Sequence, residues 1–245
     1  ANIADEYANL IERFGYWKDC GVRLEGEGAW GLTREFLQMW ERMGGGVQHE
    51  YDYYRPLHHP AAQGFCQMVV DGPDDNPNNA AEDLFLQLIS RARYTVYITT
   101  PYLAIDEPML KALCLSADSG VDVRLIMPGI PDHKLAYLVA ESYFSELMEH
   151  HVKIYTFTPG LIHGKTVLAD REVGFAGSVN MDYRSFQLHF ECGEVFYGVP
   201  AIEALLEDMD NTMSRSALMT PERMAQRPVW RRVMGTVLRL FAMWM

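Results

Sequence analysis

Short apolar runs alternate with longer amphipathic stretches through the middle of the chain. The runs are rich in β-branched and aromatic residues, as in YTVYITT and VKIYTF, and this composition is typical of strands. The predicted strands are 65–70, 94–100, 121–127 and 152–157. Between them, apolar residues at helical spacing predict helices at 79–92, 107–119 and 132–150. This alternation indicates βα units, so the predicted fold class is α/β, with helices on both faces of a sheet.

The spacing of the elements changes after Gly160. Residues 162–169 and 172–176 predict two strands joined by a hairpin at Asp170 and Arg171, and another strand follows at 190–197. Helices are predicted at 201–215 and 229–245. Strands this close together pair antiparallel, so we expect a mixed sheet.

The first part of the chain has a different character. Residues 2–14 predict an acidic helix, and residues 30–43 predict an amphipathic helix that ends at three consecutive glycines. Residues 47–64 are rich in His, Tyr and Pro and show no periodicity, which is typical of a linker. Further on, Asn79 and Glu82 have the spacing of a capping box at the start of a helix.

Charge is unevenly distributed along the 245 residues. The net charge is −12, which argues against nucleic acid as a partner because phosphate backbones require a basic surface. The last residues, from Ser214, nevertheless hold six Arg and one Glu. Two interpretations of this basic, Trp-containing tail stay open: a helix lying in an anionic membrane surface, and a helix docked on the domain. No apolar run is long enough to predict a transmembrane helix.

Candidate chemistry is concentrated between residues 163 and 191. On a strand, His163 and Lys165 would project from the same face, and Ser178, Asn180 and Glu191 follow. An imidazole can act as nucleophile or acid/base at phosphorus, and an ammonium can stabilise the charge of phosphate oxygens. A carboxylate such as Glu191 can fix the imidazole tautomer. The four scattered cysteines and the Lys beside the His favour chemistry with no metal and no cofactor.

The string HGKTVLADREVGFAGSVN fits the pattern H-x-K-x4-D-x6-G-S-x-N and resembles the phospholipase D superfamily. The segments ITTPYLAIDEPMLKAL, SADSGVDVRLIMPG and DYRSFQLHFE are similar to the second half of bacterial cardiolipin synthases. The opening, NIADEYANLIERFGYWKD, is similar to the sequence that follows the first HKD motif in those enzymes. The resemblance implies a phospholipase D-like mixed sheet flanked by helices, an α-β-α sandwich.

The resemblance also implies a domain organisation. Residues 1–46 correspond to the end of the first half, 47–64 to a linker and 65–245 to the second half with its HKD motif. We therefore expect a fragment that lacks the first HKD motif and the membrane helices of the family. The parent enzyme would act at the cytoplasmic face of the cell membrane.

The implied activity is synthesis of cardiolipin from two phosphatidylglycerols through a phosphatidyl-histidine. By resemblance, His163 is one of the two histidines, favoured here as the acid/base, and Lys165 binds phosphate. Ser178 and Asn180 complete the phosphate site, and Glu191 orients His163. Asp170 belongs to the catalytic motif but would point to the other face of the strand and hold backbone or a neighbouring charge.

Other functions stay open. The same chemistry serves phospholipase D hydrolysis and phosphatidylserine synthesis, and a single motif is also compatible with a non-catalytic lipid-binding half-domain. His189 stands where the family usually has Asn, which would alter a contact next to the site.

Overall fold

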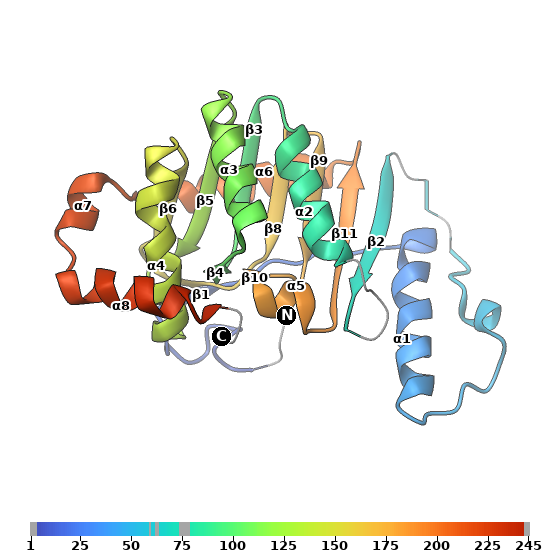
Figure 1. Cartoon of the computed structure of the whole chain (residues 1–245). Helices are drawn as coiled ribbons and strands as arrows, with labels where there is room; N and C mark the ends of the chain where they lie inside the picture. Colours follow the sequence, from blue (N-terminus) through green and yellow to red (C-terminus); the bar gives the residue numbers. More distant parts are fainter. Residues whose placement is uncertain (1–3, 59, 62–63, 74–78, 243–245) are drawn as a thin grey trace.

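The centre of the molecule is an eight-stranded mixed sheet, with the strands in the order β12-β6-β5-β3-β8-β9-β11-β2 (Figure 1). This computed structural model describes residues 4–58, 60–61, 64–73 and 79–242. The strands of the sheet are β2 (Phe65–Asp71), β3 (Thr95–Thr99), β5 (Asp122–Pro128), β6 (Lys153–Phe157), β8 (Thr166–Ala169), β9 (Val173–Gly177), β11 (Glu191–Tyr197) and β12 (Ser216–Leu218).

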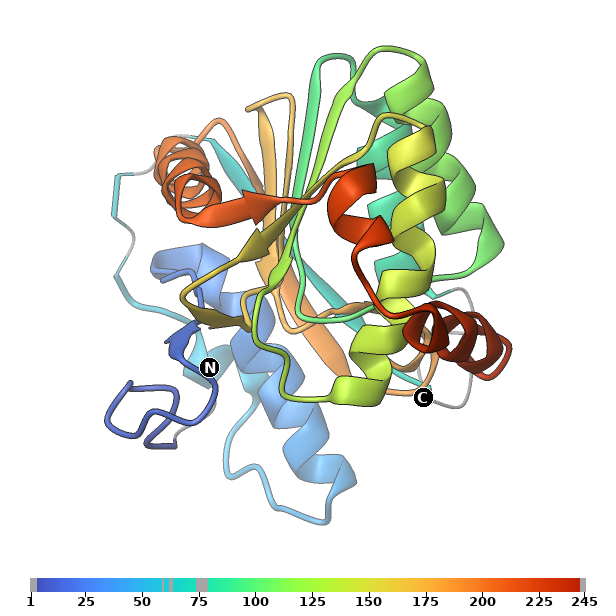
Figure 2. The same cartoon turned by 90° about the vertical axis from the view of Figure 1, so that its left-hand side faces the viewer.

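Helices cover both faces of this sheet. The helices are α1 (Trp30–Arg42), α2 (Ala80–Arg91), α3 (Glu107–Asp118), α4 (Lys134–Glu149), α5 (Tyr183–Gln187), α6 (Ala201–Ser214), α7 (Pro221–Ala225) and α8 (Val229–Arg239). One face carries α2, α3 and α4, and the other carries α6 (Figures 1 and 2). A separate apolar core fills each side. The predicted α/β class and the α-β-α sandwich are confirmed.

Strand register decides which loops meet. Strands β3, β5 and β6 are parallel, whereas β8 is antiparallel to β3 with Thr99 opposite Thr166. The segment before β8 therefore lies at the same end of the sheet as the loops after the parallel strands. Two short ladders lie at this end: β1 (Tyr16–Lys18) with β7 (Gly160–Ile162), and β4 (Leu103–Ala104) with β10 (Met181–Asp182).

The predicted hairpin is present between β8 and β9. Asp170 and Arg171 connect the two strands, with φ of 53° and 58°. Two consecutive positive φ values define the turn type whose twist matches that of the strands it joins.

Four sequence predictions need correction. Residues 4–14 form turns and bends where a helix was expected. The strand expected at 162–169 is two strands, β7 and β8, with His163 to Lys165 between them. The tail helix ends at Arg239, well before residue 245, and residues 243–245 lie outside the described ones. Asn79 does not cap α2 through its side chain; the Asp71 carboxylate accepts from the Ala81 amide at 2.8 Å instead.

Helix α1 stands outside the sandwich, beside the edge strand β2 (Figure 1). Leu37 is its buried residue, whereas Phe36, Met39 and Trp40 are exposed. Among the described residues, no helix is both long and apolar enough to cross a bilayer.

Candidate active site

His163 sits where two segments far apart in the sequence cross. Its amide donates to the Lys18 carbonyl at 2.7 Å, which continues the β1–β7 ladder by one residue. A Cβ at Gly164 would lie 2.8 Å from the Cys20 sulfur. Glycine therefore allows the motif to pass closely against the N-terminal segment. The rings of Tyr7 and Trp17 pack around the imidazole, with centroids 5.2 and 5.7 Å away.

The carboxylate that contacts His163 is Asp19. Its Oδ2 lies 3.2 Å from His163 Nδ1, and both side chains are largely buried. Burial would raise the pKa of Asp19, but the hydrogen bond to His163 and the Cys20 amide outweigh it and hold that pKa below its ordinary value. Asp19 is thus an ionised acceptor, which favours the imidazole tautomer with the proton on Nδ1. This tautomer leaves Nε2 as an acceptor.

Lys165 is buried against the same imidazole. Its Nζ lies 2.9 Å from His163 Nδ1 and 3.0 Å from Nε2, and it donates to the His163 carbonyl at 2.6 Å. Burial lowers the pKa of Lys165 to about 8, although the charges of Asp19 and Glu191 oppose the shift. The structure therefore brings His163 and Lys165 together, through a loop between β7 and β8 in place of the continuous strand expected.

Ser178 and Asn180 lie on the loop that joins β9 to β10. Ser178 Oγ accepts from the Cys192 amide at 2.9 Å and donates to the Cys192 carbonyl at 3.1 Å, which fixes the loop against β11. Asn180 Nδ2 donates to Ser185 Oγ at 3.0 Å. Its Oδ1 is buried and has no hydrogen-bond partner among the described residues. A buried amide oxygen without a partner is costly, and such atoms occur at functional sites.

Glu191 does not orient His163 in this structure, contrary to the sequence prediction. Its Oε1 accepts from Ser185 Oγ at 2.8 Å and lies 3.6 Å from His189 Nδ1. The expectation was wrong because the β1–β7 ladder places Asp19 next to His163, whereas Glu191 binds Ser185. His189, the departure from the family pattern, is thereby a direct neighbour of Glu191.

Asp170 lies at the opposite end of β8, away from His163. Its carboxylate accepts from the amides of Arg93, Tyr94 and Thr95 at 2.8, 2.7 and 2.9 Å. Burial opposes the shift, but these three donors hold the pKa of Asp170 below its ordinary value. The Asp170 side chain therefore binds backbone amides, which is one of the two roles predicted for it. It lies outside the site.

A cavity of about 700 Å³ opens beside the loop that carries Asn180. Asn180, Asp182, Arg184 and His189 line one side, and the opposite wall comes from the loop after β3 and the start of α4. Tyr102 donates to Asp132 at 2.6 Å across that wall, and burial together with this carboxylate raises the pKa of Tyr102. The apolar part of the wall is made by Leu103, Ala104, Leu135, Ala136 and Val139. A phosphodiester with an apolar portion fits this combination of linings.

Asp19 is the site residue that sequence reasoning missed. A signal for it exists, because Asp19-Cys20-Gly21 repeats the pattern of Glu191-Cys192-Gly193. That repeat marks Asp19 as the counterpart of a predicted site carboxylate. In the part of the chain that the structure describes, no three His, Cys, Asp or Glu side chains form a metal-binding group.

Sequence comparison adds the family. The pattern of the family described as "Cardiolipin synthase, PLD-like domain" matches residues 85–213, more than half of the chain. The chain belongs to this family. Cardiolipin synthases of Geobacillus kaustophilus and Listeria monocytogenes are 36% and 34% identical to it over 242 and 244 residues. Each match covers 98% of this chain and 48% or 50% of the relative, so the chain spans about half the length of these relatives.

Solved structures show the same fold. Phosphatidylserine synthase of Haemophilus influenzae aligns with a TM-score of 0.58 at 17% identity, over 74% of this chain and 47% of that one. Nuc of Salmonella typhimurium, a phospholipase D family member, aligns with a TM-score of 0.53 at 20% identity, over 63% of this chain and 99% of that one. The phospholipase D-like fold predicted from the motif is therefore confirmed.

Proposed function

We propose that this chain supplies one half of a phosphatidyltransferase site that makes cardiolipin from two phosphatidylglycerols. The observation that carries the proposal is the contact of Asp19, His163 and Lys165: an oriented imidazole beside a buried ammonium. That pair can exchange a proton with an alcohol while the ammonium binds the phosphate oxygens. The family match and the cavity with an apolar wall support a phospholipid substrate.

In this proposal His163 acts as the acid/base. His163 enters the first step as an imidazolium beside Asp19. The histidine of the other half attacks phosphorus, the bond to the leaving glycerol breaks, and His163 gives that glycerol oxygen its Nε2 proton and becomes a neutral imidazole. A phosphatidyl-histidine then holds the transferred group. His163 next removes the proton of an incoming phosphatidylglycerol hydroxyl, whose oxygen attacks phosphorus and releases the first histidine. Lys165 and the Asn180 amide group hold the phosphate oxygens during both steps, and Ser178 holds the Asn180 loop against β11.

The proposed domain organisation assigns residues 1–46 to the end of the first half, 47–64 to a linker and 65–245 to the second half. Two observations support it. Helix α1 lies outside the sandwich and leaves Phe36, Met39 and Trp40 exposed, as expected of a helix taken from another domain. The curated relatives are about twice as long as this chain. The parent enzyme would act at the cytoplasmic face of the cell membrane.

The test uses the protein extended upstream to include the first HKD motif. It is incubated with phosphatidylglycerol, and the lipids are separated by chromatography. Cardiolipin and free glycerol are the expected products, and His163→Ala is expected to abolish them. Cardiolipin formation that survives His163→Ala would contradict the proposal.

The same assay separates the alternatives. Phosphatidic acid as the main product would indicate hydrolysis, and phosphatidylserine formed on addition of an activated phosphatidyl donor and serine would indicate phosphatidylserine synthesis. Phospholipid binding with no turnover of any of these substrates would indicate the non-catalytic half-domain.

A further inference from the structure

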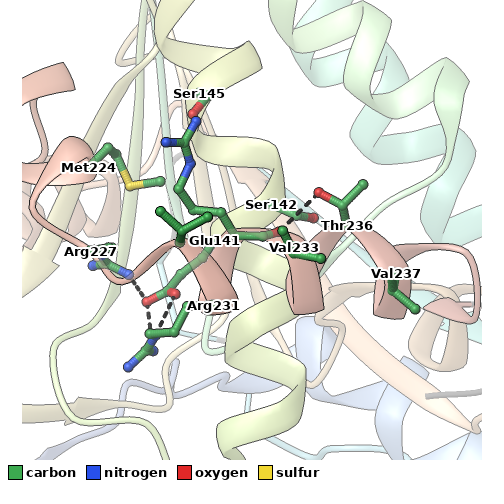
Figure 3. A pocket seen from close by; sticks show the side chains of 11 residues that line it. Glu141, Ser142, Ser145, Met224, Arg227, Arg231, Val233, Thr236 and Val237 are labelled. Carbon is green, nitrogen blue, oxygen red and sulfur yellow. Dashed lines mark hydrogen bonds and ion pairs between the residues drawn. The ribbon is translucent and has the colours of Figure 1, made fainter.

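Helix α8 docks on α4 through its basic side. Arg231 pairs with the buried Glu141 at 3.1 Å, and Arg227 pairs with the same carboxylate (Figure 3). One turn further along α4, Arg239 pairs with Glu146 at 3.0 Å and lies 4.0 Å from the centre of the Tyr143 ring. Gly235 lets the two backbones approach, because a Cβ there would lie 2.5 Å from the Leu138 carbonyl oxygen.

The outer side of α8 is therefore apolar. Surface helices of globular proteins normally bury their apolar stripe, but here the arginines face inward. The exposed side chains share the other face of the helix and its end, and we name them the α8 ridge: Val229, Trp230, Val233, Met234, Val237, Leu240 and Phe241. Leu240 is 78% exposed and Trp230 is 61% exposed. Apolar side chains exposed singly are normal on a protein surface, whereas these seven share one face and one end of a single helix.

The ridge lies at the same end of the sheet as the candidate active site. Figure 1 shows α8 at the lower end, together with β4, β10 and α5. Leu138, whose carbonyl oxygen lies against Gly235, belongs to the half of α4 that follows the carboxyl end of β5. A surface held against the ridge therefore lies at the same end of the sheet as the site.

Charge accompanies this apolar surface. From Arg223 to residue 245 the chain holds five arginines and no acidic residue, although the net charge of the whole chain is −12. Arg232 is exposed and pairs with no carboxylate in the described part of the chain. It lines a cavity of about 570 Å³ with Ser142, Ser145 and Thr236, directly beside Val233 and Val237. Cationic and hydroxyl groups bordering an apolar ridge match the headgroup and acyl layers of an anionic membrane.

We propose that the α8 ridge docks the protein on the surface of an anionic lipid bilayer. The ridge inserts below the headgroups, and Arg232 with its neighbouring hydroxyls contacts lipid phosphates. The first-half segments lie elsewhere: α1 is at the opposite edge of the molecule in Figure 1, and in Figure 2 β1 lies on the α6 side of the sheet, away from α8.

The experiment is flotation of the full 245-residue chain with lipid vesicles. Equimolar phosphatidylcholine and phosphatidylinositol are compared with phosphatidylcholine alone, because neither lipid is the proposed substrate. Binding is expected with the anionic vesicles and to weaken at high salt. Val233→Ser combined with Val237→Ser is expected to weaken it about tenfold or more. Arg232→Gln is expected to weaken it about fivefold.

Matched controls lie on α3. Leu115→Ser removes an apolar side chain that is 55% exposed, and Lys111→Gln removes one exposed positive charge. Neither control is expected to change binding. Equal losses in the ridge variants and in these controls would overturn the proposal. Because vesicle binding is measured without turnover, absence of catalytic activity leaves this result unaffected.

A second measurement tests what covers the ridge in a longer protein. The upstream-extended protein is mixed with the same vesicles made with acyl-brominated lipid, which quenches tryptophan on contact. Quenching that is reduced by Trp230→Phe supports docking. A Trp230 that stays unquenched, or a ridge-dependent dimer in sedimentation velocity without vesicle binding, would show that protein covers the ridge and would overturn the proposal.

Discussion

The two ends of β8 carry residues of the same sequence motif but differ in their burial, their hydrogen-bond partners and the pKa shifts of their charged groups. At one end, His163 and Lys165 are packed beneath a segment that contributes Asp19, and the pKa of Lys165 is lowered to about 8 by burial. At the other end, Asp170 accepts from three backbone amides, and its pKa is held down. At the first end, burial disfavours the charged form of Lys165. At the second, three amide donors stabilise the charged form of Asp170.

This difference teaches that one motif can combine chemistry with architecture. The Asp170 end fixes β8 to the start of β3, and β8 in turn fixes where His163 and Lys165 emerge. Substitutions at the two ends should therefore separate activity from stability. Activity is measured in the upstream-extended protein in each case.

Lys165→Met should abolish most activity and leave the fold intact. Removing a buried cation that stabilises phosphate oxygens is expected to lower kcat/KM by about 10³-fold. The free energy of unfolding should stay the same or increase, because burial already disfavours the ammonium. Initial rates and urea unfolding measure the two quantities. Lys153→Met, which changes an exposed lysine on β6, is the control; a similar loss there would contradict a specific role.

Asp170→Ala should have the opposite effect. Loss of a charged acceptor for three amides is expected to lower the free energy of unfolding by about 2–4 kcal/mol. Activity per folded molecule should change little. Urea denaturation measures the loss, and Asp170→Asn, which keeps one acceptor oxygen and tolerates the positive φ, should recover part of it. An unchanged unfolding curve together with a large fall in kcat would break the comparison.

Asp19→Asn should lower kcat by about 10²-fold, because the amide no longer fixes the His163 tautomer. KM should change much less, since Asp19 acts through His163 and not on substrate. Steady-state kinetics separate the two parameters, and Asp19→Glu is expected to restore part of kcat. A loss confined to KM would argue that Asp19 contacts the substrate.

The pH dependence of kcat/KM should reveal the lowered pKa of Lys165. The folded-state pKa of Lys165 lies below its ordinary value, so the ammonium loses its proton as the pH rises through about 8. We expect kcat/KM to fall about tenfold per pH unit above that point. Lys165→Arg should remove this decline whatever its absolute rate, because a guanidinium stays protonated. The same alkaline decline in Lys165→Arg would assign it to another group.

Arg171→Gly should slightly stabilise the hairpin at the Asp170 end. Arg171 has a positive φ, which costs a residue with a Cβ about 1 kcal/mol, whereas glycine adopts it freely. After the entropy cost of glycine, a gain of about 0.5 kcal/mol is expected. Thermal unfolding measures it, with the exposed Gln87→Gly in the interior of α2 as the control, which should be destabilising. A loss in Arg171→Gly would mean that the arginine makes a needed contact.

The periodicity of the sequence predicted most of the elements correctly, because helices and strands of this length depend on local spacing. It went wrong where a segment is short or where a distant group intervenes. Residues 4–14 have helical composition but form turns. The Asp71 carboxylate, eight positions before Asn79, takes the place of the expected cap of α2.

The family, the motif and the hairpin turn next to the site could all be predicted from the sequence. The tertiary structure decided which carboxylate meets His163, because Asp19 lies 144 positions away and is brought there by the β1–β7 ladder. It also decided the orientation of α8, whose arginines turn inward to Glu141 and Glu146. Local patterns encode elements, but a contact between distant residues depends on how those elements pack.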